Sequence, residues 1–594
     1  MADEGRKRKM QRKKGANLMK NLFKKIGALL VAAVMVLSMC TAAFEADAST
    51  PTTPLQPEVK TAQGTAADRG VITAQGITNA AGVTVTAYQI VKATYDETNG
   101  NFTGYKEVYA NSITNITKAN ADELAELAQT VKSDKLAANT KFPMNSVGNE
   151  TYKASVPVGS YLILVEGAES ESYNVSVISV YYTNNDGKTI ITEGKVEYLA
   201  QGNAWVKRSN NPGLDKKIIV SGKGTEKEKL DVKNSANIGD TVDYRVTIDP
   251  VPDYRGTHPT LNVVDTLSKG LTYKENSLKV YAVASSGTKA ELTENTHYEK
   301  NIGAYNEKTG TNITVNFVSK ESNKYLVNNY AGQKIVIEYS AILNEKALLN
   351  ESGNDNNAVL NYTKDSNKTN SNDSETKKTY TYTFDIRGSV DGNKSWTDNL
   401  IVKTGVDKWD ATESGHVTET QPLNGAEFTL YTDEACANVY TNTKKDGETY
   451  FAGTTTSGNA GNGQFNIYGL AFGTYYLKET KAPDTYTLNS HVFTIEITAG
   501  DAKGENAWND NGTLKNWTIK IDGNSINTFT VDKGTVKING TTNKINTTEI
   551  KNTTTSELPS TGGMGTYLFT IIGVVVMAGA AGAFFISRRK GSEE

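Results

Sequence analysis

Cysteine and histidine are scarce in this chain of 594 residues, which has 2 Cys, 4 His and 12 Pro. Cys40 lies in an apolar N-terminal run, so Cys436 is the single cysteine outside it. This excludes an intramolecular disulfide framework and a cysteine-based metal site. The histidines are isolated, without the spacing of a metal-binding motif, at His258, His297, His416 and His491. We therefore expect neither a metal nor another cofactor.

An excess of positive charge is also missing once the two ends are set aside. Residues 1–48 and 562–594 together hold 13 of the 63 Lys and Arg and 6 of the 66 acids, which leaves 50 basic against 60 acidic residues. A basic surface for nucleic acid is therefore excluded. With 51 Gly and Tyr outnumbering Phe 30 to 15, the composition is that of an ordered β protein.

The first 48 residues have the layout of a secretory signal peptide. Residues 6–25 are rich in Lys and Arg, residues 26–39 are almost wholly apolar, and Ala46-Asp47-Ala48 supplies the small residues of a cleavage site. The apolar run is too short to span a bilayer. We expect a signal helix that is removed after Ala48.

The C-terminal end predicts attachment to a cell wall. Residues 567–586 carry no charge and are long enough for a transmembrane helix, and the basic tail 588–590 after them belongs in the cytoplasm. The segment before the helix reads Leu558-Pro559-Ser560-Thr561-Gly562. This order resembles the sorting signal of Gram-positive surface proteins. The resemblance implies that a sortase cleaves between Thr561 and Gly562 and that the protein becomes linked to peptidoglycan.

Between the two ends the pattern is that of β-strands. Short alternating runs such as 241–246, 312–317 and 493–497 are bounded by Gly, Asn and Asp. One helix is predicted around 120–131, where Leu124, Leu127 and Val131 share a face. We expect an all-β fold of tandem Ig-like β-sandwiches.

Domain boundaries are predicted at Asn210-Asn211-Pro212-Gly213 and in the polar stretch 364–378. The expected parts are a signal peptide (1–48), an N-terminal β domain (49–209), a middle domain (210–385), a third domain (386–556), and a sorting signal with its transmembrane helix and tail (557–594).

The third domain contains the sequence YYLKETKAP at 475–483, preceded by LNGAEFTL at 423–430. These segments resemble the collagen-adhesin B-type domain and the E-box of Gram-positive pilins, except that Thr485 stands where the family has Gly. The resemblance implies a covalent bond between a Lys on the first strand and an Asn on the last, assisted by the E-box Glu. By position these are Lys408, Asn552 and Glu479.

Strand alternation gives an independent reason to look at these three residues. Alternate residues of a strand share a face, and each of the three shares its face with apolar residues of its own strand, namely Val402, Val406, Tyr475, Leu477 and Ile550. All three are therefore predicted to point into the core. The alternative is a buried Lys–Glu ion pair without a covalent bond.

The middle domain repeats the arrangement. The segments 214–218, 263–271 and 356–362 resemble the isopeptide-forming second domain of fimbrial backbone subunits. Alternation places Lys216, Asp265 and Asn356 inward and Lys217 outward. Glu338 is the rival acid, but the apolar residues of its strand occupy the opposite face, so we prefer Asp265.

An apolar core favours amide formation between Lys and Asn, because desolvation lowers the pKa of an amine and raises that of a carboxylic acid. The neutral amine attacks the carboxamide carbon while the protonated acid hydrogen-bonds to its oxygen, and ammonia leaves. The first domain has Val165 in place of the acid and no Lys in its opening strand 70–73. No isopeptide bond is expected there, although residues 82–90 also resemble pilins.

These resemblances imply a structural backbone pilin, polymerised by a pilin-type sortase, anchored by a housekeeping sortase, and joined to copies of itself and to ancillary pilins. Backbone pilins use a Lys in a Y-P-K-type motif for polymerisation, and Trp205-Val206-Lys207 occupies that place. The alternative for Lys207 is an ordinary solvated linker residue.

The other candidate function is a monomeric wall-anchored adhesin or an ancillary pilin. No D-x-S-x-S metal motif favours it. An enzyme is not expected, because no Ser-His-Asp set and no paired carboxylates stand out.

Overall fold

The computed structural model describes residues 58–59, 64–554 with gaps, and 574–582. The gaps within 64–554 are 109–123, 125–126, 129, 132–139, 185–189, 197, 255–258, 365–371, 387–398, 407, 411–414, 418–420, 444–448, 452–453, 457–462, 466 and 541–543. The described chain divides into two compact units. Unit 1 comprises Met1–Val232, Val242–Ala341 and Asp355–Thr379, and unit 2 comprises Lys233–Thr241, Ile342–Asn354 and Tyr380–Glu594.

The N-terminal part of unit 1 is one large sheet with the strand order β1-β10-β9-β7-β3-β5-β6-β2-β11, and β4 pairs with β3. Its strands are β1 (Glu58–Val59), β2 (Arg69–Gln75), β3 (Thr84–Tyr95), β4 (Phe102–Glu107), β5 (Lys141–Gly148), β6 (Thr151–Pro157), β7 (Gly159–Glu166), β9 (Ser176–Thr183), β10 (Tyr198–Ala200) and β11 (Gly202–Trp205). A separate pair joins β8 (Glu171–Tyr173) to β12 (Arg208–Asn210).

The predicted helix near residue 120 is confirmed at its described positions. Leu124, Leu127, Ala128 and Val131 are helical and buried. They pack on an apolar cluster that includes Tyr88, Leu162 and Val177. The helix therefore covers one face of the sheet, as its apolar stripe predicts.

The middle strands form two sheets whose alternating faces are buried. The first has the order β14-β13-β16-β23-β19-β20, with β18 paired to β23. Its strands are β13 (Gly213–Ser221), β14 (Lys229–Asp231), β16 (Thr241–Asp249), β18 (Leu271–Tyr273), β19 (Lys279–Val283), β20 (Lys289–Glu291) and β23 (Lys334–Leu343). The two short 3₁₀ helices are η3 (Asn328–Tyr330) and η4 (Asn350–Ser352).

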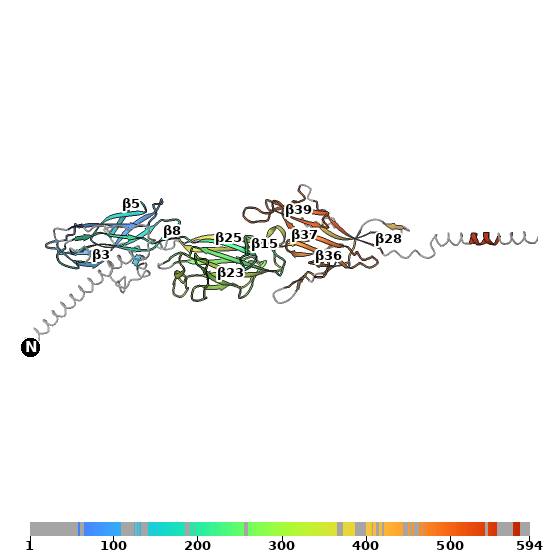
Figure 1. Cartoon of the computed structure of the whole chain (residues 1–594), viewed down its shortest axis with the longest axis horizontal. Coiled ribbons are helices and arrows are strands. Elements are labelled where there is room, and N and C mark those ends of the chain that lie inside the picture. Colours follow the sequence, from blue (N-terminus) through green and yellow to red (C-terminus); the bar gives the residue numbers. More distant parts are fainter. Residues whose placement is uncertain are drawn as a thin grey trace, which may run out of the picture. The chain divides into compact units, whose positions relative to one another are not determined.

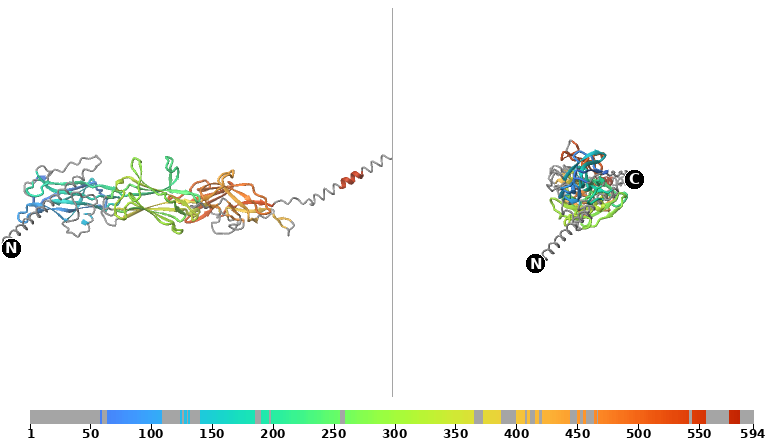
Figure 2. Two further views of the ribbon diagram at one scale, coloured as in Figure 1. Left: turned by 90° about the horizontal axis from the view of Figure 1, so that it is seen from below. Right: turned by 90° about the vertical axis from the view of Figure 1, so that its left-hand side faces the viewer.

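The second middle sheet has the order β15-β25-β24-β17-β22-β21. Its strands are β15 (Lys233–Ser235), β17 (Leu261–Leu267), β21 (Glu299–Ile302), β22 (Thr311–Asn316), β24 (Asn354–Thr363) and β25 (Asn372–Tyr382). Figure 1 labels β23 and β25, which belong to different sheets, and the left view of Figure 2 shows the middle strands in green.

Unit 2 contains a seven-stranded sheet with the order β34-β31-β36-β37-β38-β39-β40. Its strands are β31 (Glu427–Tyr431), β34 (Thr454–Thr456), β36 (Gly473–Lys481), β37 (Val492–Ala499), β38 (Asn516–Ile521), β39 (Ser525–Asp532) and β40 (Thr535–Ile538). A three-stranded sheet β30-β27-β41 consists of β27 (Ile401–Val406), β30 (Gln421–Pro422) and β41 (Thr548–Thr553). Two-stranded pairs are β26 (Phe384–Asp385) with β35 (Tyr468–Leu470), β28 (Lys408–Asp410) with β29 (Gly415–Val417), and β32 (Asn442–Thr443) with β33 (Thr449–Phe451).

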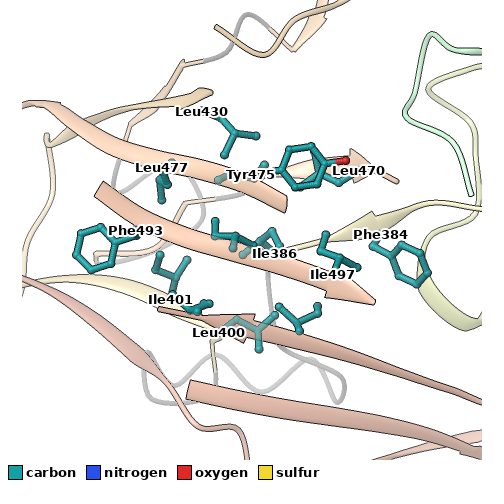
Figure 3. Close-up of a cluster of buried hydrophobic side chains, with 14 of the residues drawn as sticks. Phe384, Ile386, Leu400, Ile401, Leu430, Leu470, Tyr475, Leu477, Phe493 and Ile497 are labelled. Atoms are coloured by element: carbon teal, nitrogen blue, oxygen red, sulfur yellow. The ribbon is translucent and has the colours of Figure 1, made fainter. Parts of the chain in front are cut away.

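The core of unit 2 is formed where these sheets bring their apolar residues together. Ile401 of β27 and Ile550 of β41 belong to the same buried cluster as Leu477 of β36 and Phe493 of β37. Figure 3 shows Ile401, Leu477 and Phe493 in this cluster. Strands β27 and β41 are thus packed against the large sheet of the unit.

The all-β, tandem-sandwich prediction is confirmed by this architecture. Residues 574–582 are helical, and among the residues that the structure describes no helix is long and apolar enough to cross a membrane. The signal peptide and the motif 558–562 lie outside the described residues, and so does most of the predicted span 567–586.

Candidate functional site: two buried clusters of lysine, acid and asparagine

The first cluster, which we call the Lys216 cluster, consists of Lys216, Asp265, Tyr339 and Asn356. Each side chain is at most 2% exposed. Burial alternates along β13 and β17, so that Lys216 and Asp265 point inward while Lys217 is partly exposed. Lys216 and Tyr339 come from one middle sheet, and Asp265 and Asn356 come from the other. The cluster therefore lies between the two sheets.

Its polar atoms form a closed set of short contacts. Lys216 Nζ lies 2.5 Å from Asp265 Oδ2 and 3.1 Å from the Tyr339 hydroxyl. The Tyr339 hydroxyl donates to Asp265 Oδ2 at 2.7 Å and accepts from Asn356 Nδ2 at 2.7 Å. The amine, the acid and the carboxamide are thus all within hydrogen-bond reach of one phenol oxygen.

Burial dominates the electrostatics of the Lys216 cluster. Desolvation lowers the pKa of Lys216, and the neighbouring Asp265 carboxylate partly opposes this shift. Desolvation, followed by the charge of Asp265, raises the pKa of Tyr339 well above its usual value. Both shifts favour neutral groups, and a neutral amine is the form that attacks a carbonyl carbon.

Two oxygen atoms of this cluster have no hydrogen-bond partner. They are Oδ1 of Asp265 and Oδ1 of Asn356. A buried acceptor without a donor costs free energy. A proton on the Asp265 carboxyl would supply a hydrogen-bond donor, which Oδ1 of the Asn356 carboxamide lacks. Donation to the carboxamide oxygen is the role predicted for the acid.

Glu338, the rival acid, lies on the opposite face of its strand. Its Oε1 accepts from Arg245 Nη2 at 2.6 Å and from Lys289 Nζ at 3.0 Å, and its side chain is 13% exposed. Glu338 therefore belongs to a charged network on the outer face of the sheet, whereas Asp265 lies against Lys216 in the core.

The second cluster corrects the sequence-based choice of lysine. The lysine beside Glu479 is Lys403, which is fully buried on β27, and not Lys408. Strand β27 ends at Val406, and Lys408 opens the separate β28–β29 ribbon, where its backbone faces Val417. Alternation does not relate Lys408 to Val402 and Val406, because Lys408 lies on a different strand from these two residues.

The Lys403 cluster consists of Lys403, Glu479 and Asn552. Glu479 Oε1 lies 3.6 Å from Lys403 Nζ and accepts from Asn552 Nδ2 at 3.0 Å. Lys403 Nζ also donates to the Ile550 carbonyl at 2.8 Å. All three side chains are at most 2% exposed, and Asn552 Oδ1 has no hydrogen-bond partner. The acid thus lies between the amine and the carboxamide.

Strand pairing explains this arrangement. β27 runs parallel to β41, with Lys403 opposite Ile550 and Gly405 opposite Asn552, while Glu479 reaches them from the larger sheet. Desolvation lowers the pKa of Lys403 to about 8, against the opposing effect of Glu479. The signal that could have identified Lys403 is its position directly after the apolar run Leu400-Ile401-Val402. Such a run predicts a buried strand, in which a solvated lysine is not expected.

The departure from the E-box at Thr485 has a structural consequence. Its backbone has φ = 72°, a left-handed conformation that Gly adopts freely and a β-branched residue rarely does. The turn from Pro483 to Tyr486 is kept, with the Tyr486 N–H donating to the Pro483 carbonyl at 3.1 Å. The chain therefore preserves the shape of the E-box turn at the expense of local strain.

The N-terminal sheet lacks a comparable cluster in its described part. Between residues 64 and 209 the described buried polar side chains are Gln89 and several Ser and Thr, with no Lys, Asp or Glu among them. Val165, which stands where the acid would be, is buried among apolar residues of β7. This agrees with the expectation that no bond forms there, which stays a prediction.

Lys207, the predicted linking lysine, is exposed between β11 and β12. Its side chain is 59% exposed, and its Nζ lies 2.7 Å from the carboxylate of Asp253, which is 5% exposed. Val206 is fully buried, and its N–H donates to the Gln75 carbonyl at 2.8 Å. A proline could not make this hydrogen bond, so the departure from the Y-P-K pattern extends the pairing of β11 with β2.

Comparison with known families gives three matches. Residues 238–366 match the family described as Gram-positive pilin backbone subunit 2, Cna-B-like domain. Residues 413–512 match the SpaA prealbumin-like fold domain, and residues 550–593 match the LPXTG cell wall anchor motif. The first two ranges contain Asp265, Tyr339, Asn356 and Glu479.

Comparison with individual proteins gives similar relatives. The trypsin-resistant surface T6 protein of Streptococcus pyogenes serotype M6 is 28% identical over 555 residues, which cover 86% of this chain and 93% of the relative. The structure of the T6 backbone pilin is 19% identical with a TM-score of 0.45, covering 82% of this chain and 99% of that one. The full-length major pilin SpaD of Corynebacterium diphtheriae is 16% identical with a TM-score of 0.41, covering 84% and 100%.

The family matches agree with the sequence motifs of the middle domain, the third domain and the C-terminal end. They make the chain a secreted surface protein that is anchored to the cell wall. The chain is a homologue of the backbone pilin subunits of sortase-assembled pili and carries their LPXTG anchor.

Proposed function

We propose that this chain forms the shaft of a pilus, and that amide bonds between Lys216 and Asn356 and between Lys403 and Asn552 crosslink it internally. The observation that carries the proposal is the pair of buried clusters, each with one amine, one acid and one carboxamide. Glu479 contacts both other groups in one cluster, and the Tyr339 hydroxyl connects the three groups in the other. Such a set in an apolar core is costly as an ion pair, because desolvation is expensive. Its conversion into a neutral amide removes that cost.

The geometry supports amide formation at both clusters. In each, the acid lies beside the lysine amine and takes its proton, which leaves a neutral nucleophile close to the carboxamide. The fold holds the groups together, so that an intramolecular reaction replaces a bimolecular one, with an effective molarity on the order of 10⁵ M or more. Each reaction releases one ammonia molecule and needs no cofactor.

The position of the bonds suits a protein under tension. Lys403 and Asn552 lie on β27 and β41, the parallel strands near the two ends of the third domain. Lys216 lies on β13, which opens the middle domain, and Asn356 lies on β24, near its end. A bond between such strands closes a loop of well over 100 residues and, by analogy with disulfides, stabilises the fold by several kcal/mol, roughly 4–5 in the chain-entropy account. Pulling on the chain ends then loads a covalent bond instead of strand hydrogen bonds.

Polymerisation is proposed to use Lys207 as the nucleophile that attacks the Thr561 acyl-enzyme of a neighbouring subunit. Its exposed amine is accessible to a pilin-type sortase, and the buried carboxylate of Asp253 fixes its direction. A housekeeping sortase then joins the finished polymer to peptidoglycan, and ancillary pilins attach to the same shaft. The subunit acts as a structural component and not as an enzyme.

The first prediction concerns mass. The mature chain should weigh roughly 34 Da less than its sequence, because each of the two bonds releases an ammonia of roughly 17 Da. Asp265→Ala and Glu479→Ala should each halve this deficit, since each acid assists one bond. Intact-mass spectrometry measures the deficit, and peptide mapping that recovers all four amine and amide side chains unmodified would refute both crosslinks.

The second prediction separates the two lysines of the third domain. Lys403→Ala should remove the Lys403–Asn552 bond and halve the deficit, whereas Lys408→Ala should leave the full deficit, because Lys408 lies on a different strand pair. The two variants change the same residue type five positions apart, so each is the control of the other. A full deficit in Lys403→Ala would contradict the corrected assignment.

The third prediction concerns polymerisation. Lys207→Ala should abolish high-mass ladders when the chain is coexpressed with its pilin sortase, and the intact-mass deficit should be unchanged because the folded core is intact. Lys217→Ala, which changes a partly exposed lysine of the same unit, should leave the ladders in place. Ladders that persist without Lys207 would exclude it as the linking residue, and a wild-type chain that stays monomeric would favour the adhesin or ancillary pilin.

The fourth prediction concerns anchoring. Thr561→Ala should leave the protein in the membrane fraction, because the uncharged segment 567–586 still stops transfer while the sortase has no Thr–Gly bond to cleave. Ser560→Ala is the control, since this position varies in the L-P-x-T-G pattern. Fractionation of cell walls and membranes distinguishes the two, and normal wall anchoring of Thr561→Ala would show that the motif is not used.

A further inference from the structure

We propose that Tyr339 is a catalytic residue of the Lys216–Asn356 reaction, in which its hydroxyl passes a proton from the lysine amine to the departing amide nitrogen. The inference rests on the proposed crosslink and adds a participant that neither the predicted site nor the family matches assign. Alternation along β23 places Tyr339 on the buried face, opposite to Glu338, but gives it no chemical role.

The contacts of the hydroxyl are the first observation. Its oxygen lies 3.1 Å from Lys216 Nζ and 2.7 Å from Asn356 Nδ2, so that it bridges the attacking and the leaving nitrogen. Its proton is directed to Asp265 Oδ2 at 2.7 Å. A structural tyrosine needs one partner for its hydroxyl, whereas this one contacts every reacting group of the cluster.

The second observation is the difference between the two clusters. In the Lys403 cluster the acid itself accepts from the Asn552 amide nitrogen, at 3.0 Å. In the Lys216 cluster the corresponding amide nitrogen donates to Tyr339, and neither Asp265 Oδ1 nor Asn356 Oδ1 makes a hydrogen bond. Tyr339 thus occupies the place that the acid has in the other cluster.

The surroundings hold the hydroxyl in this place. The ring of Tyr339 is stacked on that of Tyr244, with centroids 5.3 Å apart and an interplanar angle of 23°. Lys216 Nζ lies 5.4 Å from the Tyr244 ring centroid and 5.6 Å from that of Tyr339. The two rings therefore form an apolar wall that keeps water from the amine and fixes the direction of the phenol.

The proton steps balance without any further reagent. Lys216 first gives one proton to the Asp265 carboxylate, and the resulting neutral amine attacks Cγ of Asn356, whose carbonyl electron pair moves to Oδ1. The attacking nitrogen then gives a second proton to the Tyr339 oxygen while that hydroxyl gives its own proton to Nδ2. The Cγ–Nδ2 bond breaks, ammonia leaves, the carbonyl re-forms, and Tyr339 ends as it began. Because the phenol never has to exist as an anion, its raised pKa does not oppose the relay.

The test compares the two bonds within one molecule. The mature chain is made by cell-free synthesis, samples are quenched over time, and each bond is quantified by peptide mapping. Tyr339→Phe keeps the stacked ring and should slow formation of the Lys216–Asn356 bond by roughly tenfold or more, while the Lys403–Asn552 bond forms at its normal rate. Tyr273→Phe, which removes a hydroxyl that accepts from the Leu278 N–H in the same core, should behave like the wild type.

The outcomes are distinct. A Tyr339→Phe chain that is folded, as judged by resistance to trypsin, and forms the Lys216–Asn356 bond at the wild-type rate would overturn the relay. A wild-type chain without that bond would overturn the proposed crosslink itself. If Tyr339→Phe fails to fold, synthesis of the wild-type chain in mixtures of H₂O and D₂O decides. Two protons moving together give a curved decline of the rate with deuterium fraction, and a straight decline would contradict the relay.

Discussion

The burial of a lysine amine beside a carboxyl group is the constraint around which the two domains that hold the clusters are organised. A buried ion pair is stabilising only when its geometry and hydrogen bonds are nearly complete. Here they are incomplete, because Oδ1 of both Asn356 and Asn552 lacks a donor. The clusters therefore stabilise the fold little as permanent ion pairs, whereas their groups are suitable reactants for an amide bond. The same desolvation that makes the charged state costly lowers the pKa of both lysines.

The two clusters reach this state by different strand geometries. In the middle domain the lysine and the tyrosine come from one sheet, and the aspartate and asparagine come from the other. In the third domain the lysine and asparagine lie on adjacent parallel strands, and the glutamate comes from the opposing sheet. In the third domain the acid therefore faces its partners across the core. In the middle domain the acid lies on the same sheet as its asparagine, on the neighbouring strand. Chemistry of one kind is thus built on two distinct frameworks, which accounts for the tyrosine being needed in only one of them.

The N-terminal sheet shows what the same fold class does without such a cluster. Its described core is filled by apolar residues with Gln89 and hydroxyl side chains, some of which bond to each other, as in the hydrogen bond from Gln89 Nε2 to the Tyr161 hydroxyl. Lys207, the proposed linking lysine, lies after β11 and is exposed, whereas Lys216 and Lys403, the proposed crosslinking lysines, are buried. Each lysine thus has the exposure that its proposed chemistry requires.

The sequence alone determined the fold class and the cell wall anchor motif. It also determined the inward positions of Lys216, Asp265, Asn356, Glu479 and Asn552, because alternation along a continuous strand fixes which face a residue takes. It could not determine Lys403, since β27 is buried on both faces and alternation carries no information where both faces are apolar. Alternation also predicts which face of β23 Tyr339 takes, but not which atoms its hydroxyl contacts. The distance between that hydroxyl and the reacting nitrogens depends on how β23 packs against β17 and β24. Contacts across a sandwich are set by sheet packing, and only the tertiary structure decides them.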